Sequence, residues 1–172
     1  MKYFGIIFAL FFSCIALAKP EAYFTPSRDC ENKIINLIKK SQNTIDVAVY
    51  AINNDAIVDA LKDAHNRGVI VRVLTDRIQA GQKSSKVSEL EDAGILLMRH
   101  RKYRIQHDKF AIFDSKKIVT GSYNWTNSAS KYNAENCLFL SDKTREKYIQ
   151  RFETLWNLNK ELYTKEQIKR AL

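Results

Sequence analysis

Short apolar runs alternate with amphipathic segments after residue 18, and this alternation constrains the fold more than any other feature of the chain. The apolar runs have the length and composition of β-strands; they cover residues 45–52, 69–74, 95–98, 107–113, 117–120 and 134–140. The amphipathic segments have helical spacing; they cover residues 27–40, 54–68, 85–93, a long segment from Asp142 and a short last helix after Thr164. Strands that alternate with helices predict an α/β domain with a largely covered sheet.

The first 18 residues have the pattern of an export signal rather than of a folded element. Lys2 gives a positive start, residues 3–17 form an uncharged apolar run, and Ala16-Leu17-Ala18 supplies the small-x-small sequence that signal peptidase recognises. The run is shorter than the ~20 residues that a membrane-spanning helix needs. We therefore expect cleavage after Ala18 and an exported protein, periplasmic or secreted. An uncleaved N-terminal membrane anchor is the second alternative, and lipidation at Cys14 is the third.

Residues 19–172 have the length and composition of one globular domain. This segment contains two cysteines, Cys30 and Cys137. In an oxidising compartment they can form a disulfide, whereas free cysteines pack as small buried hydrophobic residues. The sequence leaves both alternatives open.

Residues 107–114 carry more polar side chains than a core strand should, and they read His-Asp-Lys-Phe-Ala-Ile-Phe-Asp. Side chains alternate between the two faces of a strand, so His107 and Lys109 point to one side. Phe110 and Ile112 point to the other side and can anchor the strand in the core. Asp114 has the opposite parity to His107 and falls where the strand should end. We therefore expect Asp114 to shape the following turn rather than to contact substrate.

Two further polar groups follow this strand. Ser122 and Asn124 come directly after an apolar run, share parity, and can both donate hydrogen bonds to one anion. Gly121 precedes them and lets the backbone approach closely. Glu135 stands at the head of the next apolar run, where a carboxylate needs a partner and an imidazole is a suitable one.

These groups together predict a phosphate site with divided roles. His107 can attack phosphorus as a neutral imidazole, and Glu135 can hold its other ring nitrogen and stabilise the cation that forms. Lys109, Ser122 and Asn124 can bind the non-bridging oxygens, whose negative charge grows in the transition state.

The pattern resembles a known family. Residues 107–114 resemble the HxK(x)4D motif of the phospholipase D superfamily, and residues 121–124 resemble its downstream GSxN segment. Glu135 falls where the superfamily carries its glutamate. Residues 23–26 and the strand that ends in Tyr50 are similar to the small bacterial exported endonucleases (the Nuc-like subgroup) of this superfamily. The similarity spans nearly all of the chain after the export signal.

The resemblance implies a fold, a mechanism and a partner. The fold is α/β, with a mixed, largely buried β-sheet flanked by helices on both faces and one catalytic motif per chain. The superfamily needs two motifs per site, which implies a homodimer with the active site at the two-fold interface. His107 would form a phosphohistidine, and the partner's His107 would protonate the leaving oxygen and then activate water. No cofactor is implied, and the sequence has no His/Cys cluster at metal-binding spacing.

The leading hypothesis is a metal-independent endonuclease that cleaves DNA, with RNA as a further candidate substrate, at low sequence specificity. The net charge of +9 favours a polyanionic partner, a class that also includes anionic lipid headgroups and acidic glycans. The second hypothesis is a phospholipase D-type lipid phosphodiesterase, although no large apolar insertion is present to hold acyl chains. The third is a non-catalytic nucleic-acid-binding protein, against which the intact catalytic positions argue.

Overall fold

The computed structural model describes residues 19–141 and 143–171, with side chains up to residue 162. Two sequence predictions fall outside the described residues: the export signal at residues 1–18 and the start of the long helix at Asp142. Among the described residues, no helix combines the length and the hydrophobicity needed to cross a bilayer.

Within the described residues, seven strands form one mixed sheet in the order β1-β7-β6-β5-β2-β3-β4. Strands β2, β3 and β4 run parallel, and all other neighbours are antiparallel. The strands are β1 (Glu21–Phe24), β2 (Thr44–Val49), β3 (Ile70–Asp76), β4 (Leu96–His100), β5 (Lys109–Phe113), β6 (Lys117–Gly121) and β7 (Asn136–Leu140). This topology confirms the predicted mixed α/β sheet.

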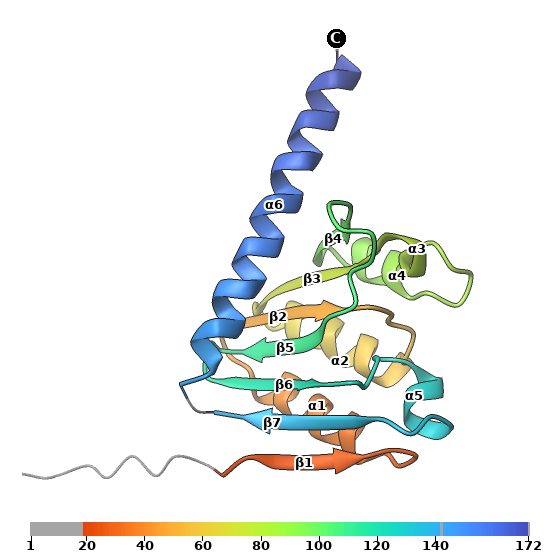
Figure 1. The fold of residues 1–172 in the computed structure, drawn as a ribbon, viewed down its shortest axis with the longest axis vertical. Coiled ribbons are helices and arrows are strands. Elements are labelled where there is room, and N and C mark those ends of the chain that lie inside the picture. Colours follow the sequence, from red (N-terminus) through yellow and green to blue (C-terminus); the bar gives the residue numbers. More distant parts are fainter. Residues whose placement is uncertain (1–18, 142, 172) are drawn as a thin grey trace, which may run out of the picture.

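Helices cover both faces of the sheet (Figure 1). Helices α1 and α2 pack on one face, and α6 crosses the other face before its C-terminal half extends beyond the sheet. The helices are α1 (Asp29–Lys40), α2 (Asp55–Asn66), α3 (Arg77–Ala80), α4 (Val87–Asp92), α5 (Asn127–Lys131) and α6 (Arg145–Ala171). The central strands are therefore buried on both sides, which is why their sequences read as nearly continuous apolar runs.

The structure differs from the sequence prediction in its shortest and its longest elements. Strand β1 and helices α3 and α5 were not predicted, because elements of four or five residues depend on tertiary contacts more than on their own periodicity. Helix α6 is a single helix where two were predicted, since neither glycine nor proline interrupts residues 145–171.

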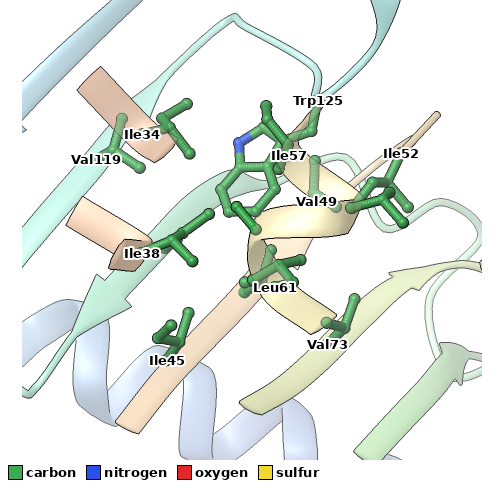
Figure 2. Packing of buried hydrophobic residues seen from close by; sticks show 14 of the residues in the cluster. Ile34, Ile38, Ile45, Val49, Ile52, Ile57, Leu61, Val73, Val119 and Trp125 are labelled. Carbon is green, nitrogen blue, oxygen red and sulfur yellow. The ribbon is translucent and has the colours of Figure 1, made fainter. Parts of the chain in front are cut away.

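Two hydrophobic clusters hold the layers together, one on each face of the sheet. In the larger cluster, Ile34 of α1 and Ile57 of α2 pack around Trp125, which is almost fully buried (Figure 2). Burying a side chain of this size contributes about 1.5–3 kcal/mol. The smaller cluster lies between the sheet and α6; its buried members are Ala48, Leu74, Phe110, Ile112, Ile118, Phe152, Leu155 and Trp156.

A disulfide joins Cys30 of α1 to Cys137 of β7, so the structure has the bridge rather than the two separate thiols. Both cysteines are buried, and 107 residues separate them in the sequence. The bridge therefore ties the helical layer to the half of the sheet that contains β1, β7 and β6.

Loss of this disulfide should strongly destabilise the fold. Closing a loop of about 100 residues restricts the unfolded chain, and loss of such a bridge typically costs about 2–5 kcal/mol. We expect the Cys30→Ala/Cys137→Ala variant to unfold at a clearly lower urea concentration than the oxidised wild type. Reductant should lower the midpoint of the wild type but leave that of the variant unchanged. Equal midpoints for all four samples would contradict the prediction.

Candidate functional site

The ends of four neighbouring strands, β2, β5, β6 and β7, lie side by side. This row of strand ends is called the edge of the sheet below. Val49 at the end of β2 pairs with Lys109 at the start of β5, and Gly121 at the end of β6 pairs with Cys137 near the start of β7. Because β5 and β6 are antiparallel neighbours, all four positions lie in a row along the right-hand edge of the sheet in Figure 1. The predicted site residues on these strand ends and the loops beside them are therefore brought to one edge.

His107 precedes the strand that it was predicted to start. β5 begins at Lys109, because β2 ends at Val49 and offers residues 107 and 108 no strand partner. The His107 side chain is exposed, and its ring centroid lies 4.6 Å from that of Tyr50. The imidazole is thus held against an aromatic ring while it remains accessible to a ligand.

Lys109 lies beside His107 and is partly withdrawn from water. Its ammonium group donates a hydrogen bond to the backbone oxygen of His107 at 2.7 Å and lies 5.3 Å from the Tyr50 ring centroid. Burial lowers the pKa of Lys109, and the nearby carboxylates of Glu135 and Asp108 only partly oppose this effect. An incompletely hydrated cation gains more from an incoming phosphate than a fully hydrated one does.

Gly121 and Ser122 form a tight crossing with the start of β7. Gly121 has a φ of +145°, and a Cβ atom there would lie 2.4 Å from the backbone oxygen of Asn136, so only glycine fits. The backbone N–H of Ser122 donates to the Asn136 side-chain oxygen, and the backbone N–H of Asn136 donates to Ser122 Oγ, both at 3.0 Å. Asn136 was not singled out in the sequence, where an asparagine at the head of a strand carries no distinctive signal.

Asn124 lies between two buried aromatic side chains, Tyr123 and Trp125. Its side-chain oxygen is buried and has no hydrogen-bond partner among the described residues. Leaving such an atom unpaired costs roughly 1–3 kcal/mol. This oxygen can only accept a hydrogen bond, so a phosphate oxygen would have to be bound by the Nδ2 group of Asn124, which is a donor.

A buried polar network holds the loop that carries Asn124. Glu31 of α1 accepts hydrogen bonds from Asn54 and from Ser130, both at 2.8 Å, and Ser130 Oγ lies 2.6 Å from the Tyr123 hydroxyl. Burial raises the pKa of Glu31, but hydrogen bonds from Arg28, Ser130 and Asn54 outweigh it and leave the pKa below its ordinary value. Sequence reasoning missed this network, because its members lie far apart in the chain.

Glu135 is half-buried beside the start of β7. Its carboxylate accepts a hydrogen bond from Asn133 at 3.1 Å, and its backbone exchanges hydrogen bonds with Thr25. The side-chain hydrogen bonds of the described residues do not include one between Glu135 and His107. The orienting role of Glu135 toward the imidazole therefore stays a prediction.

Asp114 lies at the opposite end of β5 from His107, in the turn to β6. Its carboxylate accepts hydrogen bonds from the backbone amides of Gln42, Asn43 and Thr44, at 2.7–3.2 Å. Burial alone would raise the pKa of Asp114, but these three amides outweigh it and lower the pKa. Asp114 fastens the loop before β2 to the end of β5 and lies at the opposite end of that strand from the candidate site.

An open cleft of about 480 Å³ adjoins the site on the α6 side of the sheet. Its lining contains His107, Asp108, Lys109, Phe110, Thr120, Gly121, Lys147, Tyr148 and Arg151. Among the described residues, no group of three or more histidine, cysteine or acidic side chains is arranged to hold a metal ion. The lining of the cleft thus combines one imidazole, three cationic side chains and one carboxylate.

This mixed sheet, with an imidazole and an ammonium group side by side at its edge, defines the phospholipase D class of α/β proteins. Residues 34–156 match the family model described as cardiolipin synthase, PLD-like domain, so the chain belongs to this family of the phospholipase D superfamily.

The chain is similar to curated proteins with two different names. It is 41% identical over 128 residues to a protein named phospholipase D of Rickettsia prowazekii, and 35% identical over 130 residues to one named mitochondrial cardiolipin hydrolase of Chlamydomonas reinhardtii. These matches cover 74% and 75% of this chain but only 62% and 58% of the relatives. The chain thus spans about 60% of the length of these relatives.

Two solved structures match over nearly their whole length. Nuc of Salmonella typhimurium, titled a phospholipase D family member, superposes with a TM-score of 0.76 at 26% identity, over 81% of this chain and 94% of that one. NucT of Helicobacter pylori gives a TM-score of 0.75 at 25% identity, over 81% of this chain and 96% of that one. These matches support the Nuc-like subgroup that the sequence indicated.

Asp114→Asn should lower stability at neutral pH without removing a group from the candidate site. Loss of a charged acceptor for backbone amides should cost about 1–3 kcal/mol. Because the pKa of Asp114 is lowered in the folded state, its stabilisation is complete above the unfolded value of about 3.9 and is lost as the pH falls below it. The difference from wild type, measured by urea unfolding, should therefore shrink from pH 7 toward pH 3. The exposed Asp63→Asn is the matched control and should change stability little at either pH.

Proposed function

We propose that the protein is a metal-independent endonuclease that hydrolyses phosphodiester bonds of nucleic acid with low sequence specificity. The observation that carries this proposal is the pairing of an accessible imidazole, His107, with the partly buried ammonium group of Lys109 at an open, cation-lined cleft. DNA is the principal substrate in this proposal, and RNA is a further candidate.

In the proposed first step, the neutral His107 imidazole attacks phosphorus, and a phosphohistidine forms as the P–O bond to the leaving oxygen breaks. Lys109 and Asn124 bind the non-bridging oxygens, and Ser122 adds its hydroxyl hydrogen, because Ser122 Oγ already accepts from the Asn136 amide. Glu135, which accepts from Asn133 in the structure, would stabilise the imidazolium. Water then breaks the P–N bond and regenerates His107.

A second acid–base group is needed to protonate the leaving oxygen and to activate water. This chain has one such motif, so we propose a homodimer in which the partner's His107 supplies that group at a two-fold interface. The proposed site is complete only in the dimer.

Two observations favour nucleic acid over lipid as the substrate: the coverage of the structural matches to Nuc and NucT, and the net charge of this chain. The matches to Nuc and NucT cover 94% and 96% of those chains, so this chain contains nearly all of their fold. A net charge of +9 favours a polymer of phosphates.

Lipid phosphodiester hydrolysis is the second candidate function. The relatives named phospholipase D and mitochondrial cardiolipin hydrolase favour it, at 41% and 35% identity. Among the residues that line the cleft beside His107, Phe110 and Tyr148 are the large apolar ones, so the cleft offers few apolar side chains to hold acyl chains.

We also propose that the protein is exported, either cleaved after Ala18 or held at a membrane by residues 1–18. The Cys30–Cys137 disulfide supports an oxidising compartment, because such bridges are rare in reducing ones.

Cleavage should persist in excess EDTA and should depend on His107. We expect the wild type to cut DNA, whether single-stranded or double-stranded. For each substrate the rate with EDTA should equal the rate without it. Loss of the nucleophile should lower the rate by more than about 10³-fold in His107→Ala. Asp63→Asn, an exposed substitution remote from the cleft, should retain wild-type cutting.

Two outcomes would overturn parts of this proposal. Cutting that stops in EDTA would refute the metal-independent mechanism. Headgroup release from cardiolipin vesicles without any DNA cleavage would replace the nuclease with the lipid phosphodiesterase.

Mixing active and inactive chains should reveal whether two copies share one site. If each site needs His107 from both subunits, an equal mixture of wild type and His107→Ala after subunit exchange should retain about a quarter of the wild-type activity. If each chain acts alone, about half should remain. The fraction of mixed dimers is measured with differently tagged chains, and monomeric protein that is fully active would refute the dimer.

A further inference from the structure

Two cations of α6 extend the cleft beyond the reacting groups. Lys147 and Arg151 are four residues apart, so they lie on the same face of the helix. Both line the cleft that His107 and Lys109 also line. We propose that Lys147 and Arg151 form a second phosphate subsite, which binds the phosphate next to the scissile one on a nucleic-acid strand. This inference rests on the proposed nuclease function and specifies how that site distinguishes its substrate.

The helix that carries these cations is firmly held. Phe152 and Leu155, on the neighbouring face of α6, are completely buried against the sheet. The ring of Tyr148, which follows Lys147 in the helix, packs edge-on against the Phe110 ring of β5, with 5.2 Å between the ring centroids. A substrate therefore meets cations whose backbone is already fixed, so that less ordering is required on binding.

The charges in the cleft favour an anion. The ammonium group of Lys147 is exposed and has no carboxylate partner among the described residues. Arg151 donates to Asp108 at 3.1 Å, and its guanidinium group lies 5.8 Å from the Tyr103 ring centroid. A guanidinium group has five N–H donors, so Arg151 can bind Asp108 and still offer donors to a phosphate. With Lys109, the cleft contains three cations against the single carboxylate of Asp108.

Two phosphate positions in one cleft match a polymer better than a single headgroup. A phospholipid with one phosphate would use only the position at His107 and Lys109. A nucleic-acid strand presents a neighbouring phosphate at every step, and Tyr148 offers an aromatic edge to the nucleoside between them. Cardiolipin also carries two phosphates, so it is the lipid that the experiment must include.

The test compares a thymidine trinucleotide, which offers a phosphate to both positions, with the dinucleotide, which has only the scissile one. We expect the wild type to cleave the trinucleotide with a kcat/KM about tenfold higher. In Lys147→Ala/Arg151→Ala this ratio should fall to near one. For a longer single strand, the plot of log affinity against log salt concentration has a negative slope. Loss of one phosphate contact in the double variant should make this slope shallower by about 0.7.

Three further variants separate the subsite from other effects. Lys39→Ala/Lys40→Ala removes the same charge from the exposed end of α1, on the opposite face of the sheet, and should keep the wild-type ratio. Arg151→Lys retains a cation beside Asp108 and should keep most of the preference. Lys147→Ala alone leaves the Arg151–Asp108 pair intact and should still lower the ratio.

The outcomes distinguish this inference from the nuclease proposal. Two results would overturn the subsite but not the nuclease proposal. One is equal kcat/KM of the wild type for the trinucleotide and the dinucleotide. The other is a ratio of these two kcat/KM values that is unchanged in the double variant. An equal loss of preference in the α1 control would also overturn it, because the effect would then be one of net charge. Cleavage of cardiolipin vesicles with no cleavage of either nucleotide would overturn both.

Discussion

The register of β5 between β2 and β6 is the constraint on which the site depends. Phe110 and Ile112 of β5 are buried under α6, and Ala111 and Phe113 are buried under α1 and α2. A slip of one residue would move each set to the other face and would displace Lys109 from its place beside Val49. The same apolar contacts that stabilise the sheet therefore fix the distance of His107 and Lys109, the proposed catalytic pair, from the strands on either side.

The loop with Asn124 is fixed by a different kind of interaction. Its aromatic residues are anchored in the larger core cluster, and the buried carboxylate of Glu31 links α1 through Ser130 to Tyr123. Removal of one partner from a buried network leaves the others unpaired, which costs more than the bond itself contributes. The disulfide from Cys30, next to Glu31 in α1, reinforces the same layer. The two halves of the site are thus positioned by packing and by buried polar contacts respectively.

Much of this arrangement could be predicted from periodicity and spacing. The long strands and helices followed from apolar patterns, and the second helical segment was predicted to start at residue 54, where Asn54 caps α2. The start of β5 was placed two residues early, because parity continues past the point where β2 stops offering a partner. The Glu31 network and the pairing of Ser122 with Asn136 could not be predicted, because they join residues that only the fold brings together.

The fold leaves buried polar groups without hydrogen-bond partners close to the proposed catalytic groups. Two buried side-chain polar atoms lack a hydrogen-bond partner in the described part of the chain, Gln106 Nε2 and Asn124 Oδ1. Gln106 directly precedes His107, and Asn124 follows the end of β6, the neighbour of β5. Their buried neighbours Asn54 and Asp76, by comparison, are engaged as helix caps. Unsatisfied groups that concentrate at one edge are expected where a fold gives up local stability to bind a ligand. The position of these two unpaired groups supports the same end of the sheet as the functional one, independently of the spacing of its histidine and lysine.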